Sequence, residues 1–393
     1  MNILRPKKIV LLGMMSRMAV AGNVWLVAQY LIGFQRLGYE VYYVEAHGCA
    51  PLKFIRGEGD DGWAGAARFI AGIMESFGLR DRWALHAVYD HGDCYGLSAT
   101  QLKELYRSAA LIINLHGGTI PLPEHAATGR LVYLGTDPGE REIDLDQNVT
   151  KTVDLLAPHC AFFTWGLNYG HPDCGLPVSE RFHFRPSPPP VVMDFWEGIG
   201  DGRGRAFTTV GNWRQAGREV RYRGEVYHWS KHLEFLKFLD VPRRTGQVFE
   251  LALSGSSYTP AERQLLEASG WAVRDALTFS ANPDAYRRYV AGSRGEFTVA
   301  KDQNVRLRSG WFSERSATYL AAGRPVVTQE TGFGNVLPTG EGLFAFATLD
   351  DIVAAVECLN ADYERHAREA RQLAREYFNY DVVLPRLLSE AGV

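Results

Sequence analysis

The stretch WFSERSATYLAAGRPVVTQETGFG, residues 311–334, combines a capped helix, a glycine turn and a strand, and it sets the expected fold. Ser313 is suited to begin the helix, because its hydroxyl can accept a hydrogen bond from a backbone N–H of the next turn. Good helix formers follow from Glu314 to Ala322, and Gly323 favours a stop before the strand RPVVTQ. This pattern is typical of one repeat of an α/β domain.

The first turn of this predicted helix is a candidate anion site. Backbone N–H groups and the helix dipole attract phosphate there, and Arg315 and Ser316 can add further hydrogen bonds. Ligands of doubly wound domains bind at the carboxyl ends of the strands, where such a turn lies. From these residues alone, a phosphate-binding helix and an ordinary capped surface helix are equally expected.

The alternation of strand, loop and helix extends along the rest of the chain. Strands are expected in the runs KKIVLLGMM, YEVYYVEAHG, AALIINLHGG, RLVYLGTDPG, AFTTVGNW, VFELALSG and EFTVAK, with helices between them. Four prolines between residues 186 and 190 favour a stiff connector. We therefore expect two α/β domains, residues 1–185 and 206–372, joined by a linker of residues 186–205.

The bulk composition agrees with two globular domains. A chain of 393 residues is too long for one compact core, and its formal net charge of -3 gives no support for nucleic-acid binding. The chain contains no apolar run of the roughly 18–20 residues that a membrane span needs. Its 5 scattered cysteines argue against a disulfide framework, and the start MNILRPKKIVLLGMMSR has no clear signal-peptide cleavage pattern. We therefore expect a cytoplasmic protein without an integral membrane segment.

The segment YLAAGRPVVTQETGFG resembles the donor-binding segment of nucleotide-sugar glycosyltransferases with the GT-B fold, in the superfamily of families 1 and 4. The resemblance implies two facing Rossmann-like domains around a cleft, with the donor held by the second and the acceptor by the first. It also implies a C-terminal helix, here residues 373–393, that crosses back to the first domain. The partners would be a nucleotide diphosphate sugar as co-substrate and a small-molecule or glycan acceptor, with no other cofactor and no bound metal.

The sequence departs from this family at one position. Many retaining members carry two glutamates eight residues apart, the second lying five residues before the glycine of the turn. Thr318 occupies that second position here, and counting eight residues on from Glu314 leads to Ala322. The paired-glutamate pattern is therefore absent.

Candidate donor-binding residues follow from this resemblance and from their places at strand ends and helix starts. Gly211 and Asn212 allow a close backbone approach, Trp213 can either stack on a ligand or fill the core, and Lys231 or Lys301 can neutralise a diphosphate. A loop after the last strand would lie beside the sugar. The full set is Gly211, Asn212, Trp213, Lys231, Lys301, Ser313, Glu314, Arg315, Ser316, Thr331, Gly332 and Phe333.

Candidate acceptor-side residues lie at strand ends of the first domain. An inverting transferase needs a base for the acceptor proton, and His116 or Asp137 would serve, although Asp137 before Pro-Gly is also a normal turn residue. The acceptor-binding candidates are Gly13, Gly22, Asn23, Glu45 and His47.

Other site types are less favoured. His91 with Cys94 and His171 with Cys174 have the spacing of zinc ligands, but both pairs lie in turn-forming contexts far apart in the sequence. The first loop lacks the G-x-G-x-x-G pattern, and neither a P-loop nor a G-x-S-x-G elbow is present. Three alternatives to a transferase stay open: a sugar-nucleotide epimerase of the same fold, a two-lobe ligand-binding protein, and a catalytically silent relative.

Overall fold

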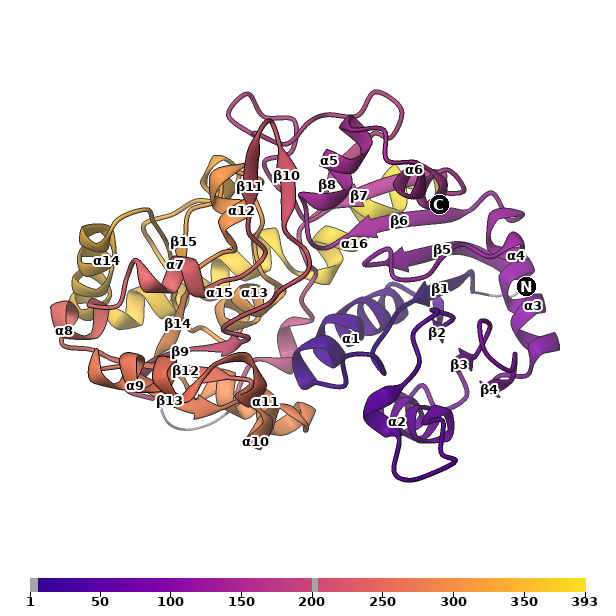
Figure 1. Ribbon diagram of the computed structural model, residues 1–393, viewed down its shortest axis with the longest axis horizontal. Helices are drawn as coiled ribbons and strands as arrows, with labels where there is room; N and C mark the ends of the chain where they lie inside the picture. The colour runs from indigo at the N-terminus through magenta and orange to yellow at the C-terminus, as the bar shows by residue number, and fades with distance from the viewer. Residues whose placement is uncertain (1–5, 200–203) are drawn as a thin grey trace.

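The computed structural model describes residues 6–199 and 204–393, and it contains two α/β domains side by side (Figure 1). The first domain, indigo to magenta in Figure 1, is on the right of the view, and the second, largely orange to yellow, is on the left. The expected fold class is confirmed. Four residues of the expected linker, 200–203, lie outside the described residues.

Within residues 6–199, eight strands form one sheet in the order β4-β3-β2-β1-β5-β6-β7-β8, and only the β3–β4 pair is antiparallel. The strands are β1 (Lys8–Leu12), β2 (Glu40–Glu45), β3 (Trp83–His86), β4 (Cys94–Gly96), β5 (Ala109–Leu115), β6 (Leu131–Gly135), β7 (Ala161–Thr164) and β8 (Phe184–Pro186). The helices are α1 (Ala21–Arg36), α2 (Trp63–Ser76), α3 (Ala99–Ser108), α4 (Pro123–Ala126), α5 (Glu140–Asp146) and α6 (Thr150–Leu156), with short 3-10 turns at Leu52–Phe54 and Met193–Phe195.

Within residues 204–393, six parallel strands form the second sheet in the order β13-β12-β9-β14-β15-β16. They are β9 (Ala206–Gly211), β12 (Val248–Leu253), β13 (Ala272–Asp275), β14 (Gly295–Thr298), β15 (Val326–Gln329) and β16 (Leu343–Phe346). The helices are α7 (His232–Leu236), α8 (Val241–Thr245), α9 (Pro260–Ala268), α10 (Leu277–Ser280), α11 (Pro283–Ala291), α12 (Asp302–Arg306), α13 (Glu314–Ala321) and α14 (Leu349–Ala361), with 3-10 turns at Gly255–Ser257 and Phe333–Asn335. A hairpin of β10 (Val220–Tyr222) and β11 (Glu225–Tyr227) was not expected from the sequence.

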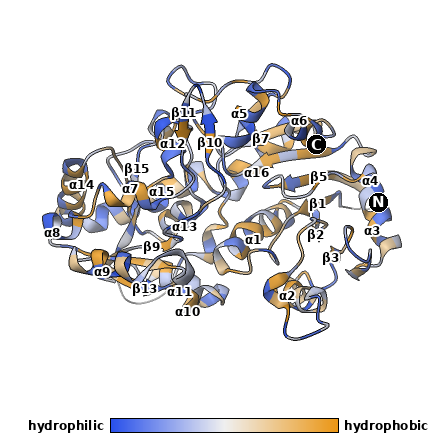
Figure 2. Ribbon diagram, in the orientation of Figure 1, coloured by the Kyte–Doolittle hydropathy of each residue, from blue (hydrophilic) through white to orange (hydrophobic). Residues whose placement is uncertain are grey.

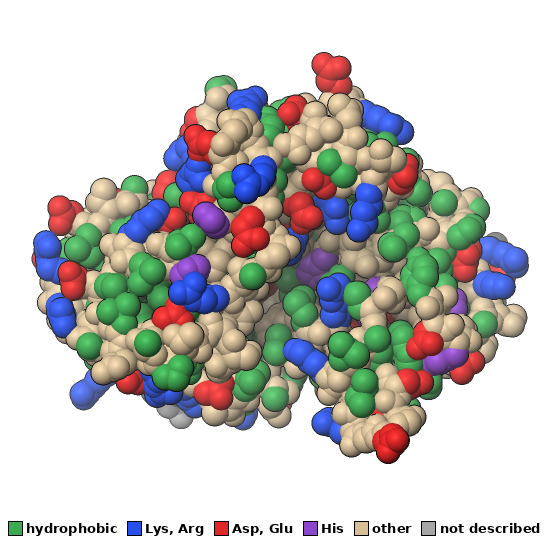
Figure 3. Space-filling view, in the orientation of Figure 1, with side chains coloured by type: hydrophobic (Ala, Val, Ile, Leu, Met, Phe, Trp, Pro, Cys, Tyr) green, Lys and Arg blue, Asp and Glu red, His purple; other side chains and the backbone are tan. Residues whose placement is uncertain are grey.

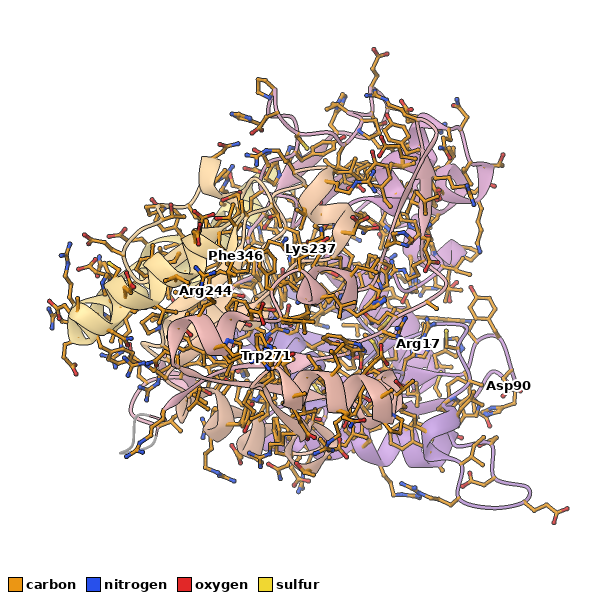
Figure 4. The ribbon with its side chains drawn as sticks, turned by 60° about the vertical axis from the view of Figure 1, so that its left-hand side comes forward. Arg17, Asp90, Lys237, Arg244, Trp271 and Phe346 are labelled. Atoms are coloured by element: carbon orange, nitrogen blue, oxygen red, sulfur yellow. The ribbon has the colours of Figure 1, made fainter. Side chains whose placement is uncertain are left out.

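The predicted strands are the continuous apolar runs, because a parallel sheet is covered on both faces. Four of the five residues of β1 and all of β6 are buried. Figure 2 shows hydrophobic residues concentrated along such strands and on the inward sides of the helices. Trp271 and Phe346, labelled in Figure 4, belong to the apolar core of the second domain.

The two last helices serve different domains. Helix α15 (Tyr363–Tyr377) packs on α13 of the second domain, whereas α16 (Tyr380–Glu390) packs on α1 of the first. The fit to α1 is close, since a Cβ at Gly33 would lie 2.5 Å from Leu384 Cδ1. The expected crossing helix is therefore confirmed, and the segment that crosses begins at Tyr380.

The chain passes between the domains at two adjacent segments. The Val191 amide donates to the Phe378 carbonyl at 2.7 Å, and the Tyr380 amide donates to the Val191 carbonyl at 2.9 Å. The proline connector and the approach to α16 are thus joined by an isolated parallel β-bridge between Val191 and Asn379. This pairing fixes the two crossings relative to each other.

Candidate functional site

A cavity of about 380 Å³ lies between the two domains, at the carboxyl ends of both sheets. Figure 3 shows the hollow between the two halves of the molecule. The sequence-predicted residues on its wall are Gly22, Asn23, His116 and Asp137 from the first domain and Gly211, Asn212, Glu314 and Arg315 from the second. Tertiary structure therefore brings candidate residues of both domains to one cavity.

Asp137 and Lys301 form an ion pair across the domain boundary. The Lys301 Nζ donates to Asp137 Oδ1 at 2.8 Å and lies 3.1 Å from the centre of the Trp229 ring. A second cation, the Arg218 guanidinium, is 3.8 Å from the Asp137 carboxylate. Burial acts to raise the pKa of Asp137, but the charge and hydrogen bond of Lys301 lower it below its ordinary value. Asp137 is therefore an ionised carboxylate and Lys301 is already paired.

His116 follows β5 in a left-handed backbone conformation, with φ of 64°. Its Nδ1 is 2.7 Å from Thr136 Oγ1, and its Nε2 is buried without a partner among the described residues. Burial lowers the pKa of His116 to about 4. The ring is therefore neutral at pH 7, with one nitrogen held by Thr136 and the other buried without a partner among the described residues.

Arg315 is fixed in the cleft wall by groups of its own domain. Its guanidinium donates to Glu296 Oε1 at 2.5 Å, to the Val210 carbonyl at 2.7 Å and to Thr298 Oγ1 at 3.2 Å. Burial opposes its charge, but the Glu296 carboxylate keeps the pKa of Arg315 above its usual value. The neighbouring Glu314 also reaches the cavity, and burial raises the pKa of its carboxyl. The guanidinium is a permanent positive charge beside the strand ends.

Lys231, just before α7, lies close to this guanidinium. Its Nζ donates to Thr298 Oγ1 at 3.2 Å and lies 5.4 Å from the centre of the Trp311 ring, which lines the cavity. Burial and then the charge of Arg315 lower the pKa of Lys231 well below its ordinary value. In the part of the chain that the structure describes, Lys231 forms no ion pair. A bound anion would stabilise the charged form of this amine, because burial and a neighbouring cation disfavour that form in the free protein.

The predicted helix cap is confirmed, but its serines lie under the surface. Ser313 Oγ accepts a hydrogen bond from the Arg315 amide at 3.2 Å, and Gly323 ends the helix region with a φ of 67°. Both Ser313 and Ser316 are buried, so the first turn presents Glu314 and Arg315 to the cavity instead.

Trp213 belongs to the core of the second domain, which decides between the two roles that the sequence allowed. Its ring is fully buried, stacks on Phe235, and donates from Nε1 to Glu262 Oε1 at 2.8 Å. The ring therefore has no free face for a base or a sugar. Gly211 and Asn212, in the same loop, do line the cavity.

The loop after β15 does not reach the cavity wall, contrary to expectation. Thr331 Oγ1 donates to the Trp311 carbonyl at 2.8 Å, and Phe333 is buried against Phe312. Gly332 turns the chain with a φ of 96° directly beneath Asn168 of the first domain. Of these three residues, Gly332 contacts the first domain, whereas Thr331 and Phe333 are held by Trp311 and Phe312 of their own domain.

Gly13, Glu45 and His47 are structural in the first domain. A Cβ at Gly13 would lie 2.5 Å from the Tyr43 ring, so this glycine permits close packing. The fully buried Glu45 carboxylate accepts from the Ser16 amide and contacts the buried His47 Nε2, each at 2.9 Å. Glu45 and His47 do not line the cavity. They therefore stabilise the loop between β1 and α1 and are not placed to bind an acceptor.

Gly22 and Asn23 lie in the first turn of α1, whose N-terminus faces the cleft. Asn23 Nδ2 donates to the Met18 carbonyl at 3.2 Å, which shapes the loop in front of this turn. Of the five acceptor-binding candidates in the first domain, only these two line the cavity.

The architecture around this cavity is that of solved glycosyltransferase structures. AviGT4, a glycosyltransferase involved in avilamycin A biosynthesis, matches with a TM-score of 0.54 and 13% identity, over 98% of this chain and 97% of its own. HepE from Anabaena in complex with UDP gives a TM-score of 0.56 at 11% identity, over 98% and 99% of the two chains. An alpha-glucosyltransferase in complex with UDP and a 13-mer DNA gives 0.55 at 8% identity, over 99% and 100%.

The chain has the GT-B fold. Neither a protein-family model nor a curated protein matches its sequence. At these identities the similarity shows the fold alone. The chemistry of the site has to be inferred from the residues in the cleft.

Trp311, Thr136 and Tyr286 are among the cavity residues of this GT-B chain that were not singled out from the sequence. Trp311 begins the segment that suggested the fold, and Thr136 precedes Asp137 at the end of β6, so their positions were a usable signal. Tyr286 lies on α11 and faces Gly22 across the domain boundary, with its hydroxyl 3.7 Å from the Cβ that a substitution there would add. Nothing in its local sequence marks it.

Two further features complete the GT-B description. Thr318, where many retaining members carry glutamate, donates its hydroxyl to the Arg315 carbonyl at 2.7 Å inside α13. In residues 6–199 and 204–393 there is no group of three or more His, Cys, Asp or Glu arranged to hold a metal ion. Nor does that part of the chain contain a helix with the length and apolarity needed to cross a membrane.

Proposed function

We propose that the protein transfers a glycosyl group from a nucleoside diphosphate sugar to an acceptor held against the first domain. The observation that carries this proposal is Lys231. Among the described residues this lysine has no ion-pair partner, and its amine lies close to the guanidinium of Arg315, which lines the cavity at the carboxyl edge of the second sheet. A diphosphate is the chemical group that such a pair accommodates best.

The second domain supports the departing nucleotide. Gly211 and Asn212 leave room for a backbone approach, and the first turn of α13 adds its N–H groups and dipole near Arg315. Positive charge fixed in advance at the leaving diphosphate lowers the barrier, because the nucleotide leaves as an anion. We assign the largest share of catalysis to these groups.

Of the two predicted bases, His116 and Asp137, we assign His116 to take the acceptor proton. Both are weak bases, since burial lowers the pKa of His116 to about 4 and Lys301 lowers that of Asp137. A weak base accepts the proton late, once bonding to the anomeric carbon has made the acceptor oxygen acidic. His116 is preferred because its Nε2 has no partner among the described residues, whereas Asp137 is engaged with Lys301.

Uridine nucleotides are the first donors to test. Solved HepE structures hold UDP and UDP-glucose, and they share the GT-B fold with this chain. We therefore infer a UDP-hexose donor, with the base held near Ser254 and Ala276 at the ends of β12 and β13, where they line the cavity.

A thermal-shift panel of UDP, GDP, TDP and ADP with their sugars tests the proposal. We expect the uridine compounds to raise the melting temperature most, because a ligand that binds only the folded state stabilises it. Isothermal titration of Lys231→Met should show at least about a tenfold loss of UDP affinity, which corresponds to one charge-assisted bond. The matched control is Lys151→Met, an exposed lysine on α6. A panel in which no nucleotide changes the melting temperature rules the proposal out.

A further inference from the structure

The loops at the carboxyl edge of the first sheet expose an unusual number of apolar side chains. Strands β3, β2, β1 and β5 are parallel neighbours, so the loops that follow them lie along one edge. Five large side chains on these loops are between 41% and 71% exposed. They form what we call the apolar rim: Met18, Leu52, Ile55, Tyr89 and Ile120.

This concentration is specific to one edge. Within residues 6–199, the only other large apolar side chain with comparable exposure is Val178, on the loop after β7. Scattered apolar side chains on a surface need no explanation, but a grouped set indicates a binding surface.

The apolar rim is continuous with the cleft. Met18 and Lys53 line the cavity, and Leu52 and Ile55 lie within two residues of Lys53 in the sequence. The loop after β3 contacts the loop after β2, because the Tyr89 ring lies 3.1 Å from the Cβ that a substitution at Gly48 would add. The rim therefore begins inside the cleft and extends outward over the first domain.

The charge of these loops limits what can bind there. Five carboxylates, Glu58, Asp60, Asp61, Asp90 and Asp93, stand against three basic groups, Arg17, Lys53 and Arg56. Figure 4 shows Arg17 and Asp90 on two loops of the first domain, on the same side of the molecule. An anionic membrane or a nucleic acid would be repelled by this excess of negative charge.

We propose that the acceptor carries an uncharged apolar portion that lies on the apolar rim while its hydroxyl group enters the cleft. The inference rests on the proposed function for the identity of the cleft. It extends that function by naming the class of acceptor: a small molecule with an aromatic or aliphatic body, in contrast to a free sugar.

The binding test uses N-phenyl-1-naphthylamine, an uncharged apolar fluorophore. Its fluorescence should rise on binding to the full-length protein, and the dissociation constant should increase at least about tenfold in the double variant Leu52→Ser/Tyr89→Ser, since two apolar contacts are removed. Leu265→Ser, on the outer face of α9, is the matched control and should bind the probe like the wild type. Equal binding by the rim variant and the wild type overturns the proposal.

A competition experiment tests the acceptor class. 4-Nitrophenyl β-glucoside should displace the probe at a concentration at least about tenfold lower than methyl β-glucoside, because only the first has an aromatic body. Displacement at equal concentrations overturns the proposal. Circular dichroism shows whether each variant keeps its fold, and its UDP affinity shows whether the cleft is intact. If the rim variant also lost its affinity for UDP, that result would count against a separate acceptor surface.

Two results separate this inference from the proposed function and from a membrane role. If no nucleotide binds but the rim variant still loses the probe, the proposed function fails and the apolar site stands as a ligand site of another kind. If the protein sediments with vesicles of phosphatidylcholine and phosphatidylglycerol, and the rim variant does not, the surface docks on lipid and the small-molecule proposal is wrong.

Discussion

The Asp137 carboxylate of the first domain and the Lys301 ammonium group of the second are 2.8 Å apart, so two candidate residues chosen for opposite substrates bind each other. Trp229 covers the lysine, and Arg218, two residues before β10, adds a second cation near the carboxylate. The pair thus joins the domains at the edge of the cleft. It also changes the expected roles, because neither charge is free for a ligand in this arrangement.

This pair should show energetic coupling. Removing Asp137 leaves the largely buried Lys301 ammonium without its partner, so Asp137→Asn and Lys301→Met should each destabilise the protein by roughly 2–4 kcal/mol. The double variant should lose less than the sum, with a coupling of about 1 kcal/mol or more. Urea unfolding of the four proteins measures it; strictly additive losses would mean that the pair does not stabilise the interface.

Gly310 should be intolerant of any side chain. Its φ is 77°, and an added Cβ would clash with the Asn168 backbone nitrogen of the first domain. We expect Gly310→Ala to cost more than about 2 kcal/mol, combining left-handed strain with the clash. Gly340→Ala is the control, because φ there is 102° but a Cβ would meet nothing within 4 Å. Similar losses in both variants would show that the clash contributes nothing.

Stability should fall in acid through buried histidines. Burial lowers the pKa of His116, His125 and His159 from 6.5 to about 4. The unfolded chain therefore binds more protons below pH 6.5, and the free energy of unfolding should decrease as the pH falls from about 6.5 towards 4. Each histidine can account for roughly 3 kcal/mol at most over that window.

The measurement is urea unfolding between pH 7 and 4. His125→Gln should show a shallower decrease than the wild type, by about one proton, since it removes one titrating ring. The exposed His183 provides the control variant His183→Gln, which should keep the wild-type slope. An identical slope in all three proteins would contradict the assignment.

Nucleotide binding should take up protons at Lys231. Its pKa is lowered in the free protein by burial and by Arg315, and a bound diphosphate would raise it again by favouring the charged form. UDP affinity should therefore fall as the pH is raised above the pKa of the free lysine, and the observed heat of binding should depend on the ionisation enthalpy of the buffer. In Lys231→Met this proton uptake should disappear. A wild-type heat independent of the buffer would argue against the role.

The helix and strand positions were largely predictable because they depend on local patterns. Ser313 and Gly323 bracket α13 as expected, and the apolar runs became the parallel strands β1, β5 and β6. The hairpin of β10 and β11 escaped prediction because its three-residue strands are too short for a periodic pattern.

The candidate site was predictable in part. Residues next to strand ends, such as His116 and Asn212, reach the cavity because parallel strands all end at one edge. Their neighbours Trp213 and Phe333 do not, since the direction of a side chain depends on packing that distant segments supply. Tyr286 reaches the cavity only because two domains face each other.

The sequence by itself determined the alternation of strands and helices, the two parallel sheets and the resemblance to one fold, because these follow from short-range periodicity, capping and turn chemistry. The tertiary structure alone decided which charges are paired. Lys301 is neutralised by Asp137, 164 residues away along the chain, whereas Lys231, beside Arg315, has no ion-pair partner within residues 6–199 and 204–393. Such differences arise from burial and from charges brought together across the domain boundary, and no local pattern encodes them.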